Sequence, residues 1–255
     1  MKLVNTIIFY KKYVQIYQGD SVVIKKILPN TKILIVAPHA DDESIGCGGI
    51  LLLYGKQCDI WVLTDGRHGH TTEKYSDEDL LIMTRQQELK KAAKFVGVKN
   101  VKFQSIEDGR LAQNMSCLLN ESITKYDYVF IPNRYESHPD HKTVYYALQK
   151  MISQQNARGC LIEYEVWTPL RRPDFFLDIS AVSDKKKALI EIFESQLADV
   201  AYAEKALALN CYRGIYNGCA FAEAYSFASN DTIWRRLWEH LSPMIQNRIK
   251  KLVKW

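Results

Sequence analysis

The chain has 255 residues, of which 47% are hydrophobic and 25% charged, and its formal net charge is +5. A chain of this length can bury the core of one α/β domain, and its modest positive charge gives no reason to expect a nucleic-acid partner. Internal repeats, low-complexity tracts and Gly/Ser linkers are absent from the sequence, which excludes repeat arrays and loosely tethered modules.

Cysteine spacing and the N-terminus indicate the compartment. Six cysteines show neither Cys-x-x-Cys pairs nor disulfide-rich spacing, so we expect free thiols in a reducing cytosol. The apolar stretch at residues 7–10 is interrupted by Asn5 before it and by Lys11 after it, which makes it too short for a signal peptide or a membrane span. We therefore expect a cytoplasmic protein, soluble or at most peripheral at the inner membrane surface.

Hydrophobic periodicity predicts strands and helices in alternation. We expect a Rossmann-like α/β fold with a mostly parallel sheet flanked by helices and a small C-terminal elaboration. The predicted strands are 33–36, 59–64, 101–103, 128–132, 161–167, 175–179 and 220–227. The predicted helices are 44–54, 77–96, 116–125, 144–152, 183–194 and 199–209.

The first predicted strand ends in a cluster of titratable side chains, namely His39, Asp41, Asp42 and Glu43. In α/β sheets, ligands bind beyond the carboxyl ends of the strands, where this turn would lie. Adjacent carboxylates repel each other unless a cation or proton is shared, so the pair beside a histidine indicates a metal site. Consecutive side chains point in different directions, so one aspartate can bind the metal while the other faces a substrate.

This turn has two other interpretations. Asp41 or Asp42 could cap the following helix, although a cap needs only one of them. The glycines within residues 46–49 could form a dinucleotide loop, but the spacing G-x-G-x-x-G is not met and the acidic cluster would repel a pyrophosphate. We expect these glycines to let the helix approach the sheet closely.

A second strand, turn and helix begins at residues 128–132 and leads into His138-Pro-Asp-His141. If the two strands are parallel in one sheet, their turns lie on the same edge and His141 can meet His39 and Asp42. Two imidazoles and one carboxylate leave the open position that is typical of a catalytic zinc site.

The motifs Pro38-His-Ala-Asp-Asp-Glu43 and His138-Pro-Asp-His141 together resemble the LmbE-like (PIG-L) family of zinc-dependent N-deacetylases. Members of that family remove acetyl groups from N-acetylglucosaminyl compounds and related amino sugars. The usual family motif has proline after the histidine, whereas here Pro38 precedes it and Ala40 follows it. The resemblance covers about residues 32–228 and includes Thr64-Asp-Gly66, Arg85-x-x-Glu88, Glu165-Val-Trp167, Lys187-Ala-Leu, Ser195-Gln196 and Ala222-Glu-Ala224.

The resemblance implies a role for each side chain of the two motifs. It implies that His39, Asp42 and His141 bind zinc, with another divalent transition metal as the alternative. It implies that Asp41 is the general base for the attacking water, and that His138 stabilises the oxyanion and helps to protonate the leaving amine.

Two further residues are expected to contact the substrate. The resemblance makes Arg85 a clamp for a sugar hydroxyl or phosphate, whereas the simpler interpretation is a surface ion pair with Glu88, one helical turn away. Asp140 is expected at the substrate site, where it could also orient a histidine.

The sequence divides into an N-terminal extension (1–30), an LmbE-like deacetylase domain (31–230) and a basic amphipathic C-terminal helix (231–255). Apolar residues such as Trp234, Trp238 and Leu241 recur on one face of that helix, and six arginines and lysines surround the stripe. Such a helix packs on its own domain or a partner subunit, or lies on an anionic membrane near a lipid-linked substrate. Homo-oligomerisation is left open.

The sequence is compatible with two functions of different classes. The first is a zinc-dependent hydrolase that removes acetyl from an N-acetylated amino sugar. The second is a non-catalytic sugar- or nucleotide-binding Rossmann-like module with a structural metal site. Asp41 and His138 favour the hydrolase, because a structural site needs neither an open position nor two extra titratable groups.

Overall fold

The computed structural model describes residues 15–16, 22–23, 27, 30–69, 77–157, 159–197 and 200–228. The predicted helix at 231–255 and most of the predicted extension at 1–30 lie outside these described residues. The strands are β1 (Gln15–Ile16), β2 (Val22–Val23), β3 (Ile33–Ala37), β4 (Cys58–Thr64), β5 (Asn100–Ile106), β6 (Tyr128–Pro132), β7 (Cys160–Tyr164), β8 (Phe175–Asp178) and β9 (Ala222–Phe227).

The α-helices are α2 (Asp42–Tyr54), α3 (Glu78–Val96), α4 (Met115–Leu119), α5 (Pro139–Gln154), α6 (Ser183–Ile190) and α7 (Tyr202–Asn217). Short 3-10 turns lie at Gly55–Gln57, Ser180–Val182 and Glu194–Gln196.

The strands form one sheet in the order β1-β2-β8-β9-β7-β6-β3-β4-β5. Strands β7, β6, β3, β4 and β5 pair in parallel, whereas β9 is antiparallel to both of its neighbours, β7 and β8. This arrangement is the mostly parallel α/β fold expected from the sequence. The chain runs from β3 to β4 on one side and to β6 on the other, so the sheet has a switch point between β3 and β6.

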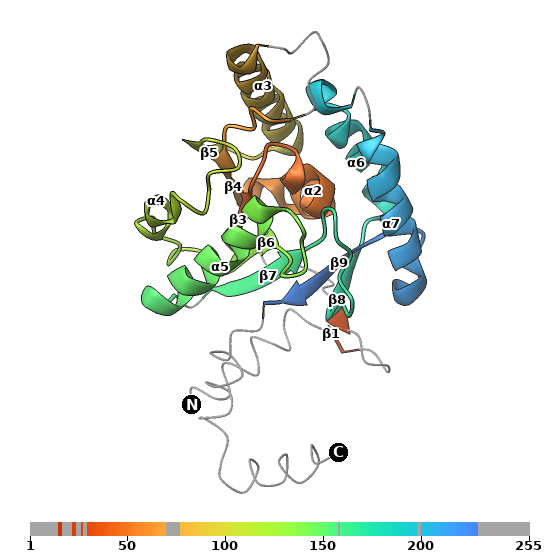
Figure 1. The fold of residues 1–255 in the computed structure, drawn as a ribbon. Coiled ribbons are helices and arrows are strands. Elements are labelled where there is room, and N and C mark those ends of the chain that lie inside the picture. The colour runs from red at the N-terminus through yellow and green to blue at the C-terminus, as the bar shows by residue number, and fades with distance from the viewer. Residues whose placement is uncertain are drawn as a thin grey trace, which may run out of the picture.

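Helices cover both faces of the sheet, as Figure 1 shows. Along β3, Ile33 and Ile35 belong to one buried cluster with residues of α2, α3 and α6, whereas Leu34 and Val36 belong to a second cluster with residues of α5. The alternation follows from the two-residue period of a strand, and burial on both faces explains why β3 is apolar throughout.

Two glycines of α2 allow this helix to lie close to neighbouring elements, as the sequence predicted. A Cβ atom at Gly46 would lie 2.2 Å from Cδ2 of Tyr164, and a Cβ at Gly49 would lie 2.3 Å from Cγ2 of Ile179. Contacts this short exclude any side chain larger than hydrogen at either position. The first turn of α2 is thereby held beside the end of β7.

Several predicted elements are shorter than expected, among them the helix predicted at 183–194, which ends at Ile190. The helix predicted at 116–125 ends at Leu119, and the strand predicted at 161–167 ends at Tyr164. Strand β7 ends there because the backbone N–H groups of the next segment, Val166 to Thr168, donate to the carboxylate of Glu136 instead of to a neighbouring strand. Among the helices in the described ranges, we find none with the length and apolar character needed to cross a membrane.

Candidate active site

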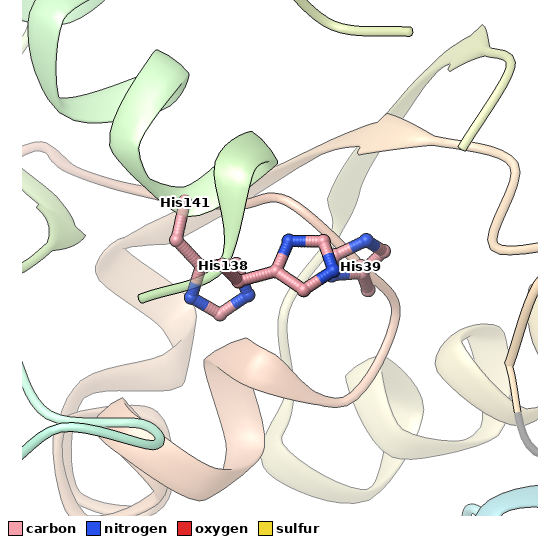
Figure 2. Close-up of side chains that lie close together, drawn as sticks. All are labelled: His39, His138 and His141. Atoms are coloured by element: carbon pink, nitrogen blue, oxygen red, sulfur yellow. The ribbon is translucent and has the colours of Figure 1, made fainter. Parts of the chain in front are cut away.

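The candidate site lies at the carboxyl ends of β3 and β6, the two strands that flank the switch point. The turn after β3 carries His39 and Asp41, and the turn after β6 carries His138. Because β3 and β6 are parallel neighbours, both turns reach the same edge of the sheet. Figure 2 shows three imidazoles from these turns gathered there, those of His39, His138 and His141.

Asp42, the first residue of α2, lies between two of these histidines. Its Oδ2 atom is 3.3 Å from Nδ1 of His39 and 3.2 Å from Nε2 of His141, and it accepts a hydrogen bond of 2.9 Å from the backbone N–H of His39. Burial alone would raise the pKa of Asp42, but the two imidazoles hold it well below its usual range. One oxygen of the Asp42 carboxylate therefore lies beside two imidazole nitrogens.

The surroundings of His141 test whether a cation fits here. Its side chain is fully buried, and within the described part of the chain neither ring nitrogen has a hydrogen-bond partner. Unpartnered buried nitrogens are rare because each loses its hydration without compensation. Imidazole nitrogens and a carboxylate are ligands that suit zinc and other divalent transition metals. The residues present therefore fit a divalent ion between His39, Asp42 and His141.

Other combinations of side chains at the site also bring donor atoms together. The ligand atoms of His39, His138 and His141 lie within 4.8 Å of one another, as do those of His39, Asp108 and Asp140. His39 belongs to both groups, with its Nδ1 facing Asp42 and its Nε2 facing the other two carboxylates.

Asp41 has an unusual backbone conformation, with φ at 139°. Its N–H donates to Oε2 of Glu43, and its carbonyl accepts from the N–H groups of Ser44 and Ile45. A non-glycine residue with such a φ costs about 1–3 kcal/mol, and strain of this kind gathers at functional sites. Asp41 precedes α2 but, among the described residues, makes no side-chain cap bond, so capping does not account for it.

The Asp41 carboxylate is buried beside a cation. Burial raises the pKa of Asp41 to about 7, although the Arg85 guanidinium acts in the opposite direction. Nη2 of Arg85 lies 3.5 Å from Oδ1 of Asp41 and donates to the carbonyl of Ala40, and Nη1 donates to the carbonyl of Gly66. Arg85 thus ties the turn after β3 to the turn after β4.

Arg85 and Glu88 are each only 3% exposed, so they do not form the surface ion pair of the simpler interpretation. Glu88 receives hydrogen bonds from the N–H and the hydroxyl of Ser195. The predicted contact of Arg85 with a substrate stays a prediction.

His138 is the most exposed of the three histidines. Its Nδ1 accepts a hydrogen bond of 3.2 Å from the backbone N–H of Asp140, and its ring packs edge-on against His39 with centroids 4.9 Å apart. Burial, together with the neighbouring imidazoles of His39 and His141, lowers the pKa of His138. A neutral ring whose Nδ1 is an acceptor carries its hydrogen on Nε2.

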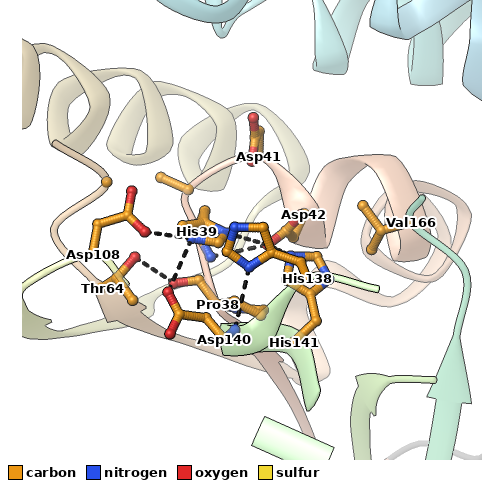
Figure 3. Close-up of polar contacts among 12 residues, drawn as sticks. Pro38, His39, Asp41, Asp42, Thr64, Asp108, His138, Asp140, His141 and Val166 are labelled. Carbon is orange, nitrogen blue, oxygen red and sulfur yellow. Dashed lines mark hydrogen bonds and ion pairs between the residues drawn. The ribbon is translucent and has the colours of Figure 1, made fainter. Parts of the chain in front are cut away.

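Asp108 and Asp140 lie on the other side of His39 (Figure 3). Nε2 of His39 is 2.9 Å from Oδ1 of Asp108 and 3.6 Å from Oδ2 of Asp140. Asp140 also accepts from the N–H groups of Gly109 and Leu111, so it holds the loop after β5 against the first turn of α5. Its predicted contact with a substrate stays a prediction.

The family model described as PIG-L, GlcNAc-PI de-N-acetylase, matches residues 34–152, which contain both motifs. This part of the chain is similar to the PIG-L family. A curated relative, diacetylchitobiose deacetylase of Thermococcus kodakarensis, is 27% identical over 224 residues, covering 77% of this chain and 82% of the relative.

Solved structures share the fold of this chain. N,N'-diacetylchitobiose deacetylase from Pyrococcus horikoshii superposes with a TM-score of 0.68 at 23% identity, over 84% of this chain and 87% of that one. The 4-carboxy-2-hydroxymuconate hydratase GalB from Pseudomonas putida KT2440 gives 0.60 at 21% identity, over 78% and 97% of the two chains. A deacetylase and a hydratase thus share one fold, so the reaction has to be argued from the site.

Two carboxylates at the site were not identified from the sequence. They are Asp108 and Glu136, whose Oε2 lies 3.7 Å from Nδ1 of His141. The one available signal was position, because each follows a strand that ends at the same edge as β3.

Proposed function

We propose that this protein is a zinc-dependent hydrolase that removes the acetyl group from an N-acetylated amino sugar, releasing acetate and a free amine. The observation that carries the proposal is the position of Asp42, whose Oδ2 lies within 3.3 Å of a nitrogen of both His39 and His141. The similarity to the PIG-L family and the deacetylase relative support an amide-hydrolysing enzyme of this kind.

In this proposal His39, Asp42 and His141 hold the ion and leave a coordination position open to the reactants. A bound zinc ion supplies Lewis-acid activation of water and of the acetyl carbonyl. The donor set also admits other divalent transition metals, since imidazole and carboxylate ligands suit several of them.

Asp41 is the proposed general base. Its carboxylate accepts a proton from the attacking water, and a pKa near 7 suits a group that must gain and lose a proton in neutral solution. Arg85, whose Nη2 lies 3.5 Å from Oδ1 of Asp41, holds this carboxylate in place. Collapse of the tetrahedral intermediate then returns the proton from Asp41 to the leaving amine.

His138 is the proposed donor to the oxyanion. With Nδ1 engaged by the N–H of Asp140, its Nε2–H is free to donate to the oxygen that becomes negative as the carbonyl is attacked. Its lowered pKa makes His138 a hydrogen-bond donor, and its help in protonating the leaving amine stays a prediction.

Acetate release from a panel of N-acetylated amino sugars tests the proposed function. We expect release from at least one free, nucleotide-linked or lipid-linked N-acetylglucosamine compound, loss of that release with a chelator, and recovery on adding Zn²⁺. A protein that binds Zn²⁺ tightly but releases acetate from none of these compounds would instead be the non-catalytic module with a structural metal.

The cytoplasmic location, homo-oligomerisation and the domain limits at 31–230 stay predictions. Membrane contact through the predicted helix at 231–255 is also a prediction, and it would suit a lipid-linked substrate. Co-sedimentation of the full chain and of a chain that ends at residue 230 with anionic vesicles distinguishes the cases, because only the full chain is expected to bind.

A further inference from the structure

Glu136 lies in the turn between β6 and α5, fully buried, and one of its oxygens is heavily engaged. Oε1 accepts from the backbone N–H groups of three consecutive residues, Val166, Trp167 and Thr168, at 3.2, 3.1 and 3.1 Å. It also accepts from the side-chain amide of Asn133 at 3.2 Å. Four donors around one oxygen fix the orientation of the whole carboxylate.

The second oxygen of Glu136 faces Nδ1 of His141. Oε2 has no hydrogen bond within the described ranges and lies 3.7 Å from Nδ1 of His141, a nitrogen that is also without a bond there. Burial raises the pKa of Glu136, whereas His141 and the backbone donors favour the carboxylate. Two complementary buried groups thus face each other across a gap that a shift of a few tenths of an ångström would close, and such bonds are often long before a site is loaded.

This arrangement has a consequence for the other nitrogen of His141. A neutral imidazole carries one hydrogen, and a carboxylate opposite Nδ1 favours the form with the hydrogen on Nδ1. Nε2, which lies 3.2 Å from Oδ2 of Asp42, then presents its lone pair toward the candidate metal position. Carboxylates behind metal-binding histidines orient the ring and raise its basicity in this way.

The same carboxylate also fixes a segment that borders the site. Val166 and Trp167 line a cavity together with Ile45 and Gly46 of α2, the helix that begins at Asp42. Trp167 is 43% exposed and packs against Tyr202 with ring centroids 5.0 Å apart, and Figure 3 draws Val166 with the side chains of the site. Asn133 reinforces the attachment by donating to the carbonyl of Thr168 at 2.7 Å. The Glu136 side chain therefore contacts both the ring of His141 and the segment 166–168.

We propose that Glu136 is a positioning residue, which holds His141 in its Nδ1–H form for metal binding and couples that ring to the segment Val166–Thr168. The inference rests on the proposed metal centre at His39, Asp42 and His141.

The substitution Glu136→Gln separates the two tasks of this side chain. The four donors around Oε1 require an acceptor, so the amide oxygen of glutamine takes that position and its NH₂ group faces His141. The segment 166–168 stays attached, but an N–H donor now lies opposite Nδ1 and favours a hydrogen on Nε2, where it blocks metal binding. The variant changes the form of the ring and keeps the anchor.

Zn²⁺ affinity, measured by competition with a chromophoric chelator, is the first readout. We expect Glu136→Gln to bind Zn²⁺ about 10–100-fold more weakly than the unsubstituted protein, the usual effect of removing such a carboxylate. The matched control is Glu88→Gln, another buried carboxylate that receives backbone and hydroxyl donors, both from Ser195, and it should bind as the unsubstituted protein does. Equal affinities of Glu136→Gln and the unsubstituted protein would overturn the inference.

A second readout needs no variant. Long-range ¹H–¹⁵N correlation spectra of the Zn²⁺-loaded protein report which nitrogen of His141 carries hydrogen, and we expect Nδ1. A hydrogen on Nε2 in the unsubstituted protein would refute the role of Glu136, even if Glu136→Gln failed to fold. Failure of the proposed function looks different, because the unsubstituted protein would then release no acetate from the N-acetylated sugars, whatever its Zn²⁺ affinity and the form of His141.

Discussion

Nε2 of His39 lies 2.9 Å from Oδ1 of Asp108, a residue 69 positions further along the chain. The opposite nitrogen of the same ring, Nδ1, faces Asp42. A carboxylate beside Nε2 favours a hydrogen on Nε2 and leaves the lone pair of Nδ1 free for a metal. Asp108 therefore has the same relationship to His39 that we propose for Glu136 and His141. Asp108 itself is held by the N–H of His68, which donates to its other oxygen.

Replacing Asp108 with asparagine is therefore expected to weaken metal binding. The amide oxygen of Asp108→Asn would accept from His68 and turn the NH₂ group toward Nε2 of His39, which moves the ring hydrogen to Nδ1. We predict a loss of about 10–100-fold in Zn²⁺ affinity, measured by chelator competition. Glu107→Gln, at the adjacent exposed carboxylate, is the control and should bind normally; a normal affinity for Asp108→Asn would show that the bond has no such role.

Asp41→Asn separates proton transfer from metal binding. Asparagine keeps the shape of the side chain and tolerates the positive φ, but it cannot accept a proton from water. We predict a fall in kcat of about 10²–10⁴-fold, as for other general bases, with Zn²⁺ content unchanged by elemental analysis. His39→Ala should lose both the metal and the activity. Undiminished turnover by Asp41→Asn would remove Asp41 from its role.

His138→Ala decides between two uses of the three-histidine cluster. If His138 donates to the oxyanion, the variant keeps its Zn²⁺ affinity within a few-fold while kcat falls by about 10²–10³-fold, the usual effect of losing one such donor. Steady-state kinetics and metal titration of the same sample provide both numbers. A collapse of metal affinity would make His138 a ligand, in agreement with the grouping of the three imidazoles within 4.8 Å.

Gly46→Ala tests the close packing that places the first turn of α2. The added methyl group would meet Cδ2 of Tyr164 at 2.2 Å and the carbonyl of Glu165 at 2.7 Å. We expect a net loss of about 1–3 kcal/mol in the free energy of unfolding from overpacking, measured by thermal or urea denaturation. Gly48→Ala is the control on the same helix, since its nearest neighbours are methylenes of Lys186 at 3.0–3.2 Å, which are longer contacts than those at Gly46. Equal stability of the two variants would contradict the packing argument.

The sequence predicted the sheet and the meeting of two of its turns, because both depend on local patterns. Apolar runs at 33–36 and 128–132 indicated parallel strands, and parallel neighbours end at the same edge. The structure pairs Ile33 with Tyr128 in β3 and β6 and brings Asp42 within 3.2 Å of His141.

Asp108 and Glu136 could not be placed from the sequence because their contacts depend on loop paths. Asp108 reaches His39 only because Asp140 and Asp65 hold the loop after β5 through its backbone N–H groups. The orientation of Glu136 depends on the segment 166–168, which was predicted to continue a strand. The burial of a charged residue also leaves no local pattern in the sequence. For that reason a surface ion pair was the simpler interpretation of Arg85, which is buried in the structure.

We expect one divalent ion to bind between His39, Asp42 and His141. A crystal of the protein grown with Zn²⁺ and measured on both sides of the zinc absorption edge tests it directly. We predict one strong anomalous peak in contact with Nδ1 of His39, a carboxylate oxygen of Asp42 and Nε2 of His141. A peak held by His39, Asp108 and Asp140 instead, or no peak at this edge of the sheet, would contradict it.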